Sequence, residues 1–89
     1  MVWAFIFKSA KANQDSVCKM EYGDNVIYTC GVNTITEGAA LAKKLHDEVG
    51  CELVELCGGF GVDGARAVAE MTGGLVRIGY VTKLNVKEE

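Results

Sequence analysis

Four apolar segments are spaced along the chain and predict strands. Residues 2–7, Val-Trp-Ala-Phe-Ile-Phe, form an unbroken apolar run, which favours a strand buried on both faces of a sheet. Residues 25–32 are rich in β-branched and aromatic side chains, and residues 51–57 and 75–82 are further apolar stretches of strand length. The pattern therefore predicts four strands.

Two segments between these strands have the residue spacing of helices. Thr34-Ile35-Thr36-Glu37 matches a capping box, in which the threonine hydroxyl and the glutamate carboxylate accept hydrogen bonds from amides at the start of a helix. We expect this helix to run to about Val49 and to end at Gly50. Asp63 is a predicted N-cap for a second helix, which would end at Gly73-Gly74.

The order of these elements predicts the fold class. Strands that alternate with helices pair in parallel through right-handed crossovers. We therefore expect one α/β domain over residues 1–89: a small, mostly parallel four-stranded sheet with two main helices, similar to a fragment of a Rossmann-like or flavodoxin-like fold. Residues 8–23 are polar and predict a connection with a short helical turn around Gln14–Met20, and the polar tail Asn85–Glu89 is expected to fray.

Composition narrows the classes of function. The net charge of −3 and the lack of a Lys/Arg-rich run argue against non-specific nucleic-acid binding, which requires clustered cations. No apolar run approaches the ~20 residues of a membrane-spanning helix, and the N-terminus lacks the basic region of a signal peptide. We therefore predict a cytoplasmic protein without nucleic-acid or membrane partners. Because a domain this small gains stability by association, a homo-oligomer, most simply a dimer, is expected.

The cysteines do not form a recognisable site. Cys18, Cys30, Cys51 and Cys57 include no C-x-x-C pair, and in a cytoplasmic chain we expect them to remain reduced. The one histidine, His46, lies within the first predicted helix. A metal site is therefore not predicted, and no motif identifies a cofactor.

The segment around residue 58 is the strongest candidate for a ligand site. Gly58-Gly59-Phe60-Gly61 joins a predicted strand to a predicted helix, at the edge where parallel sheets bind ligands. Glycine lets backbone amides approach a ligand closely, and a helix N-terminus favours an anion. Lys8, Thr82 and Lys83 end strands at the same edge and are candidate ligand contacts. The alternative interpretation is that these glycines only form a tight turn and allow close helix–strand packing.

Glu55 and Cys57 are the candidate catalytic pair. They lie two residues apart on one face of the predicted third strand, so they could flank a substrate as acid–base and nucleophile. Glu55 could instead form a structural ion pair with Arg77, or lie on a face that is wet or covered by a second subunit. Cys57 could instead be a small apolar residue that fills a gap.

Three sequence segments carry a resemblance to a known family. Trp3-Ala4-Phe5-Ile6-Phe7 and Glu55-Leu56-Cys57-Gly58-Gly59-Phe60-Gly61, with the closing Gly79-Tyr80-Val81-Thr82, resemble a family of small bacterial and archaeal proteins catalogued only as a domain of unknown function. The resemblance implies a stand-alone prokaryotic domain, and it implies no particular activity or cofactor.

Three hypotheses of function follow from these observations. The first is a binding module that holds a small anionic ligand at the turn 58–61. The second is a small enzyme that uses Glu55 and Cys57. The third is a structural module that forms homo-oligomers, in which the apolar first strand, with Trp3, Phe5 and Phe7 on one face, pairs across a dimer.

Overall fold

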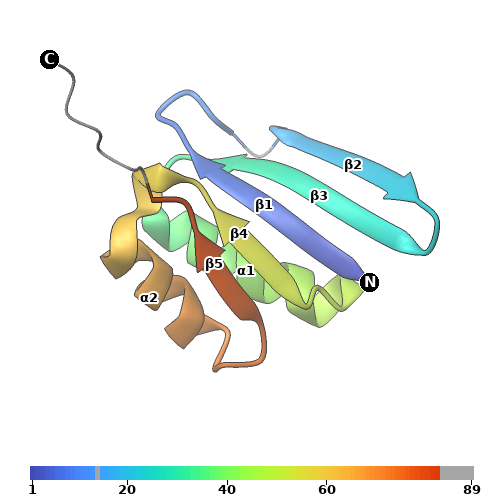
Figure 1. Cartoon of the computed structure of the whole chain (residues 1–89). Helices are drawn as coiled ribbons and strands as arrows, with labels where there is room; N and C mark the ends of the chain where they lie inside the picture. Colours follow the sequence, from blue (N-terminus) through green and yellow to red (C-terminus); the bar gives the residue numbers. More distant parts are fainter. Residues whose placement is uncertain (14, 83–89) are drawn as a thin grey trace, which may run out of the picture.

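Strands and helices make up most of the computed structural model, which describes residues 1–13 and 15–82. The predictions for Lys83 and for the tail Asn85–Glu89 lie outside these residues. Five strands form one sheet, and two helices and a short 3-10 turn connect the later strands (Figure 1). In chain order the elements are β1 (Val2–Lys8), β2 (Val17–Tyr22), β3 (Asn25–Val32), α1 (Ile35–Val49), β4 (Leu53–Leu56), η1 (Gly58–Phe60), α2 (Gly61–Met71) and β5 (Arg77–Tyr80).

The sheet has the strand order β2-β3-β1-β4-β5. The apolar strand β1 is central, and it runs parallel to β3 on one side and to β4 on the other. β4 in turn is parallel to β5. The mostly parallel α/β fold is therefore confirmed, with one strand more than predicted, because β2 pairs antiparallel with β3.

β2 corrects the interpretation of the polar segment before residue 23. The helical turn predicted around Gln14–Met20 is wrong from residue 15 onward, because Val17–Tyr22 pairs with β3 across a two-residue turn at Gly23-Asp24. Residue 14 lies outside the described residues. Gly23 has a φ of 54°, which glycine adopts without strain. Every residue of β2 is exposed, because this edge strand lies beyond the part of the sheet that the helices cover.

The first helix begins and ends as predicted, and the second ends as predicted, at Met71 just before Gly73-Gly74, but begins earlier. Thr34 Oγ1 accepts from the Glu37 N–H at 3.1 Å, and Glu37 Oε1 accepts from the Thr34 N–H at 3.3 Å, so the capping box is formed. Gly50 ends α1 in the left-handed conformation. α2 begins at Gly61, two residues before Asp63, because η1 leads directly into it. No helix in the described part of the chain is long and apolar enough to span a membrane.

Both helices lie on one face of the sheet, where they contact each other (Figure 1). The connections β3–α1–β4 and β4–α2–β5 move the chain in the same direction across the sheet. Right-handed crossovers that run in one direction place their helices on the same face. The core lies between the two layers and includes Ala4, Ile6, Ala42, Val54, Leu56 and Val68.

Neither helix of the described residues lies on the opposite face of the sheet (Figure 1). In β1, Ala4 and Ile6 are fully buried beneath the helices, whereas Trp3, Phe5 and Phe7 alternate with them and are only half-buried. The unbroken apolar run predicts that this strand is buried on both faces of the sheet. For the residues that the structure describes, that prediction is wrong. One face of β1 contacts the helices, and the other remains accessible.

Candidate functional site

The ends of the parallel strands define one edge of the sheet, here called the carboxyl edge. β1 ends at Lys8, beside Val32 at the end of β3, and β4 ends at Leu56, beside Tyr80 at the end of β5. Ligands of open parallel sheets bind at this edge. The predicted ligand residues lie on the chain at or just beyond it.

The segment Cys57–Gly61 carries the chain from β4 into α2 at the carboxyl edge. The Cys57 N–H donates to Ile6 O at 3.0 Å, which ties the start of the turn to β1. Gly61 has a φ of 66°, a conformation that favours glycine. Gly58 and Gly59 are exposed, and neither backbone N–H has a hydrogen-bond partner within the described residues. The turn therefore presents two backbone donors to solvent.

Lys8 lies against this turn. Its N–H donates to Cys57 Sγ at 3.2 Å, and a Cβ added at Gly59 would lie 3.8 Å from both Cβ and Cε of the lysine. Lys8 takes part in none of the ion pairs among residues 1–13 and 15–82. A Cβ added at Gly58 would lie 3.5 Å from the carbonyl oxygen of Val81, the residue before Thr82. The structure thus brings the candidates Lys8, Gly58 and Gly59 together, and Thr82 is the next residue after the Val81 carbonyl that lies against Gly58.

The two helix N-termini differ in how their amides are satisfied. The side chains of Thr34 and Glu37 cap α1, whereas no side chain caps α2. A helix N-terminus carries about half a positive charge on its free amides. The Gly61 N–H at the start of α2 donates to Gly58 O, so the free amides at this part of the carboxyl edge are those of Gly58 and Gly59. The Asp63 carboxylate in the first turn of α2 offsets part of their positive potential.

Phe60 is buried rather than presented to a ligand. Only 3% of its surface is exposed, and its ring lies against Gly38 of α1 and Gly64 of α2. A Cβ added at Gly38 would lie 2.6 Å from the ring, so this glycine makes room for the aromatic side chain. Phe60 therefore anchors the turn to both helices, which is a structural role for a residue that the sequence suggests as a ligand contact.

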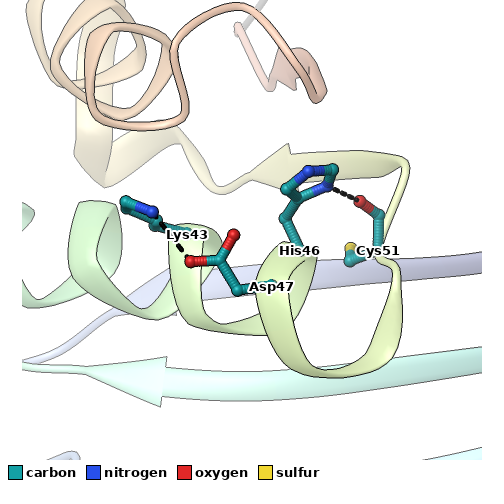
Figure 2. Close-up of polar contacts among 4 residues, drawn as sticks. All are labelled: Lys43, His46, Asp47 and Cys51. Atoms are coloured by element: carbon teal, nitrogen blue, oxygen red, sulfur yellow. Dashed lines mark hydrogen bonds and ion pairs between the residues drawn. The ribbon is translucent and has the colours of Figure 1, made fainter.

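Glu55 and Cys57 have no imidazole beside them. Glu55 is half-buried on the helix-free face, where its carboxylate lies over Gly79, and it forms no ion pair with Arg77 in the described structure. The one histidine, His46, has Nδ1 3.1 Å from the carbonyl of Cys51, just before β4 begins (Figure 2). That position is at the opposite edge of the sheet, so the histidine cannot activate the Cys57 thiol.

The remaining thiols are structural or exposed. Burial raises the pKa of the Cys30 and Cys51 thiols above the ordinary value of a thiol. The Cys51 thiol also donates a hydrogen bond to Leu53 O at 3.4 Å. Cys18 is exposed on β2, and all four cysteines are free thiols. No group of three or more His, Cys, Asp or Glu residues in the described ranges is arranged to hold a metal ion.

A separate cavity of about 620 Å³ lies between α1, the end of β3 and the loop after β1. Sequence reasoning does not find it, because several of its lining residues belong to the polar segment 8–23. Its charged and amide side chains are Asn13, Asp15, Asn33, Glu37 and Lys44. Glu37 already accepts hydrogen bonds in the capping box. The charged side chains that remain are one carboxylate, Asp15, and one ammonium, Lys44. This mixture favours no particular charge of ligand.

Comparison with known proteins yields one match. A family model with the description "Family of unknown function (DUF6506)" matches residues 1–89, which confirms the resemblance seen in the sequence. No curated protein and no solved structure matches the chain.

Proposed function

We propose that this chain, which belongs to the family of unknown function DUF6506, is a binding module that holds a small anion at the turn Gly58–Gly61. One observation carries the proposal: Lys8, which has no ion-pair partner among the described residues, lies along a turn whose two exposed glycine amides are also unpartnered there. A cytoplasmic location and a prokaryotic source remain predictions of the sequence.

The chemistry of the turn favours an anion over a neutral ligand. Successive backbone N–H groups beside a helix N-terminus form a concave set of donors that suits phosphate or carboxylate oxygens. The Lys8 ammonium adds a full positive charge on a flexible stem, and the Thr82 hydroxyl can add a further donor. Because Gly58 and Gly59 have no side chains, no Cβ of their own shields their amides.

Binding fits this geometry better than thiol catalysis does. A cysteine nucleophile of this kind is activated by a general base within hydrogen-bond reach. Cys57 Sγ instead accepts the backbone N–H of Lys8 and packs against the core, and the histidine lies at the other edge. The role that the contacts of Cys57 support is to link β1 to the turn.

The test is calorimetric titration of the protein with inorganic phosphate. Lys8→Ala removes the cation and is expected to weaken phosphate binding about tenfold, the effect of losing one charge-assisted hydrogen bond. Gly59→Val places a branched side chain over the amides and is expected to weaken it at least as much. The Cβ added at Gly59 meets only ordinary contacts, so the fold should survive.

Lys11→Ala is the matched control, because Lys11 is an exposed lysine of the loop that follows β1. We expect it to bind phosphate as the unsubstituted protein does. The proposal is overturned if phosphate does not bind, or if Lys8→Ala and Lys11→Ala have equal effects on the dissociation constant.

A further inference from the structure

We infer that the helix-free face of the sheet is the interface between two copies of this chain, packed face to face about a two-fold axis. The inference concerns a different surface from the carboxyl edge and does not depend on anion binding. It rests on the side chains that the strand register places together, on their charges and on the area of the face.

The register aligns side chains of all five strands into rows across this face. The first row is Met20, Ile27, Trp3, Leu53 and Arg77, because Trp3 pairs with Ile27 and Leu53, and these pair with Met20 and Arg77. Four of its five side chains are apolar. None of these residues is buried, and 54% of Met20 is exposed. A continuous apolar band therefore crosses four neighbouring strands.

The second row lies two residues further along the strands. It consists of Cys18, Thr29, Phe5, Glu55 and Gly79. Each row thus carries one charged residue. In the first row it is the positive Arg77 on β5, and in the second row it is the negative Glu55 on β4. Neither Arg77 nor Glu55 takes part in an ion pair among the described residues.

These rows are complementary to each other under two-fold symmetry. The two-fold axis lies in the plane between the two sheets, perpendicular to the strands and midway between the two rows. It places the first row of one copy over the second row of the other. Trp3 then faces the partner's Phe5, and Arg77 faces the partner's Gly79. Since the Glu55 carboxylate lies over Gly79 within each chain, Arg77 of each copy reaches the partner's Glu55. This ion pair therefore forms twice, once on each side of the axis, as an isologous interface requires.

The area of the face matches a modest interface. Five strands about 4.8 Å apart, each about six residues long, cover roughly 24 by 20 Å, or about 500 Å² per copy. Two copies then bury about 1,000 Å², which is at the lower bound of specific protein interfaces. Sheets stack in this way about 10 Å apart in β-sandwiches. We therefore expect a dimer that dissociates on dilution.

Sedimentation velocity across a dilution series tests this dimer. The unsubstituted protein is expected to change from dimer to monomer as it is diluted. Glu55→Arg and Arg77→Glu each place like charges against each other, so each variant is expected to be monomeric. In an equimolar mixture, however, every cross-interface pair is attractive again, and the two variants should form a mixed dimer.

The mixing step separates the interface from effects within one chain. Repulsion between neighbouring strands of one chain would persist in the mixture, so it could not restore a dimer. Met20→Lys, on the exposed edge strand, is a second variant that leaves the core intact and should also weaken the dimer. Arg66→Glu, on the exposed side of α2, is the control and should not.

Two results overturn the inference. One is a protein that stays monomeric at millimolar concentration. The other is a dimer that Glu55→Arg, Arg77→Glu and Met20→Lys all leave unchanged, which would place the interface elsewhere. Circular dichroism of each variant confirms that the chain is folded. Neither result bears on phosphate binding, which the titration of Lys8 variants measures separately.

Discussion

At the scale of single residues, the neighbours of three glycines differ in how much room they leave for a side chain. The ring of Phe60 fills the space that a side chain at Gly38 would take, and the carboxylate of Glu55 fills the space at Gly79. Gly59 differs, because a Cβ there would meet only ordinary contacts. Packing therefore requires glycine at position 38, where the neighbour is a buried ring, whereas the end of the Glu55 side chain can move away from Gly79 and Gly59 is open to a role in ligand binding.

Gly38→Ala tests the packing of the Phe60 ring. Alanine favours a helix by about 1 kcal/mol over glycine. The added Cβ lies too close to the ring, however, and overpacking of this kind costs about 1–3 kcal/mol. We expect a net loss in the free energy of unfolding, measured with urea. Gly59→Ala is the matched control, expected within about 0.5 kcal/mol of the unsubstituted protein. A stabilised Gly38→Ala variant would contradict this packing.

The buried thiols predict a pH dependence. Burial raises the pKa of Cys30 and Cys51 in the folded chain, so the unfolded chain loses these protons at lower pH. Their contribution to stability is fully present at neutral pH and decreases as the pH rises past about 8.5, the ordinary pKa of a thiol. Urea unfolding should show a smaller decrease for the double variant Cys30→Ala, Cys51→Ala. An identical decrease would exclude this cause.

At the scale of elements, the sequence predicts those helix ends that are determined by residues close to them in the chain. The capping box and Gly50 predict α1 correctly, because these interactions lie within a few residues of sequence. β2 escapes prediction, although Cys18, Met20 and Tyr22 alternate with Lys19 and Glu21 at the period of a strand. Its polar residues and full exposure resemble a loop, and only pairing with β3 makes it a strand. The start of α2 depends likewise on how Phe60 packs, which Asp63 does not reveal.

Thr34→Ala measures the contribution of the cap to α1. Loss of the threonine hydroxyl leaves the Glu37 N–H without its partner, and such changes cost about 1 kcal/mol. Thr36→Ala is a suitable control, because Thr36 is exposed in the first turn and does not cap the helix. Thermal unfolding should distinguish the two variants, and equal midpoints would show that the capping box adds nothing.

At the scale of the whole molecule, the main departure from prediction is that both helices of the described residues lie on one face of the sheet (Figure 1). The apolar run of β1 indicates burial on both sides, yet both crossovers place their helices on one side. A sequence pattern records that a side chain avoids water, but not whether its neighbour belongs to the same chain. The same limit applies to the carboxyl edge. The sequence predicts the glycine turn and places Lys8 at the same edge, whereas the fold shows the direct contact between them.

The central claim is that an anion binds the bare amides of the turn, and amide chemical shifts report on those groups directly. In a titration of isotopically labelled protein with inorganic phosphate, we predict saturable shifts of the Gly58 and Gly59 N–H resonances. Lys8→Ala should need about ten times more phosphate to reach half of these shifts, and Lys11→Ala should titrate as the unsubstituted protein does. Resonances that do not move, or that move equally over the whole surface, would contradict the proposed site.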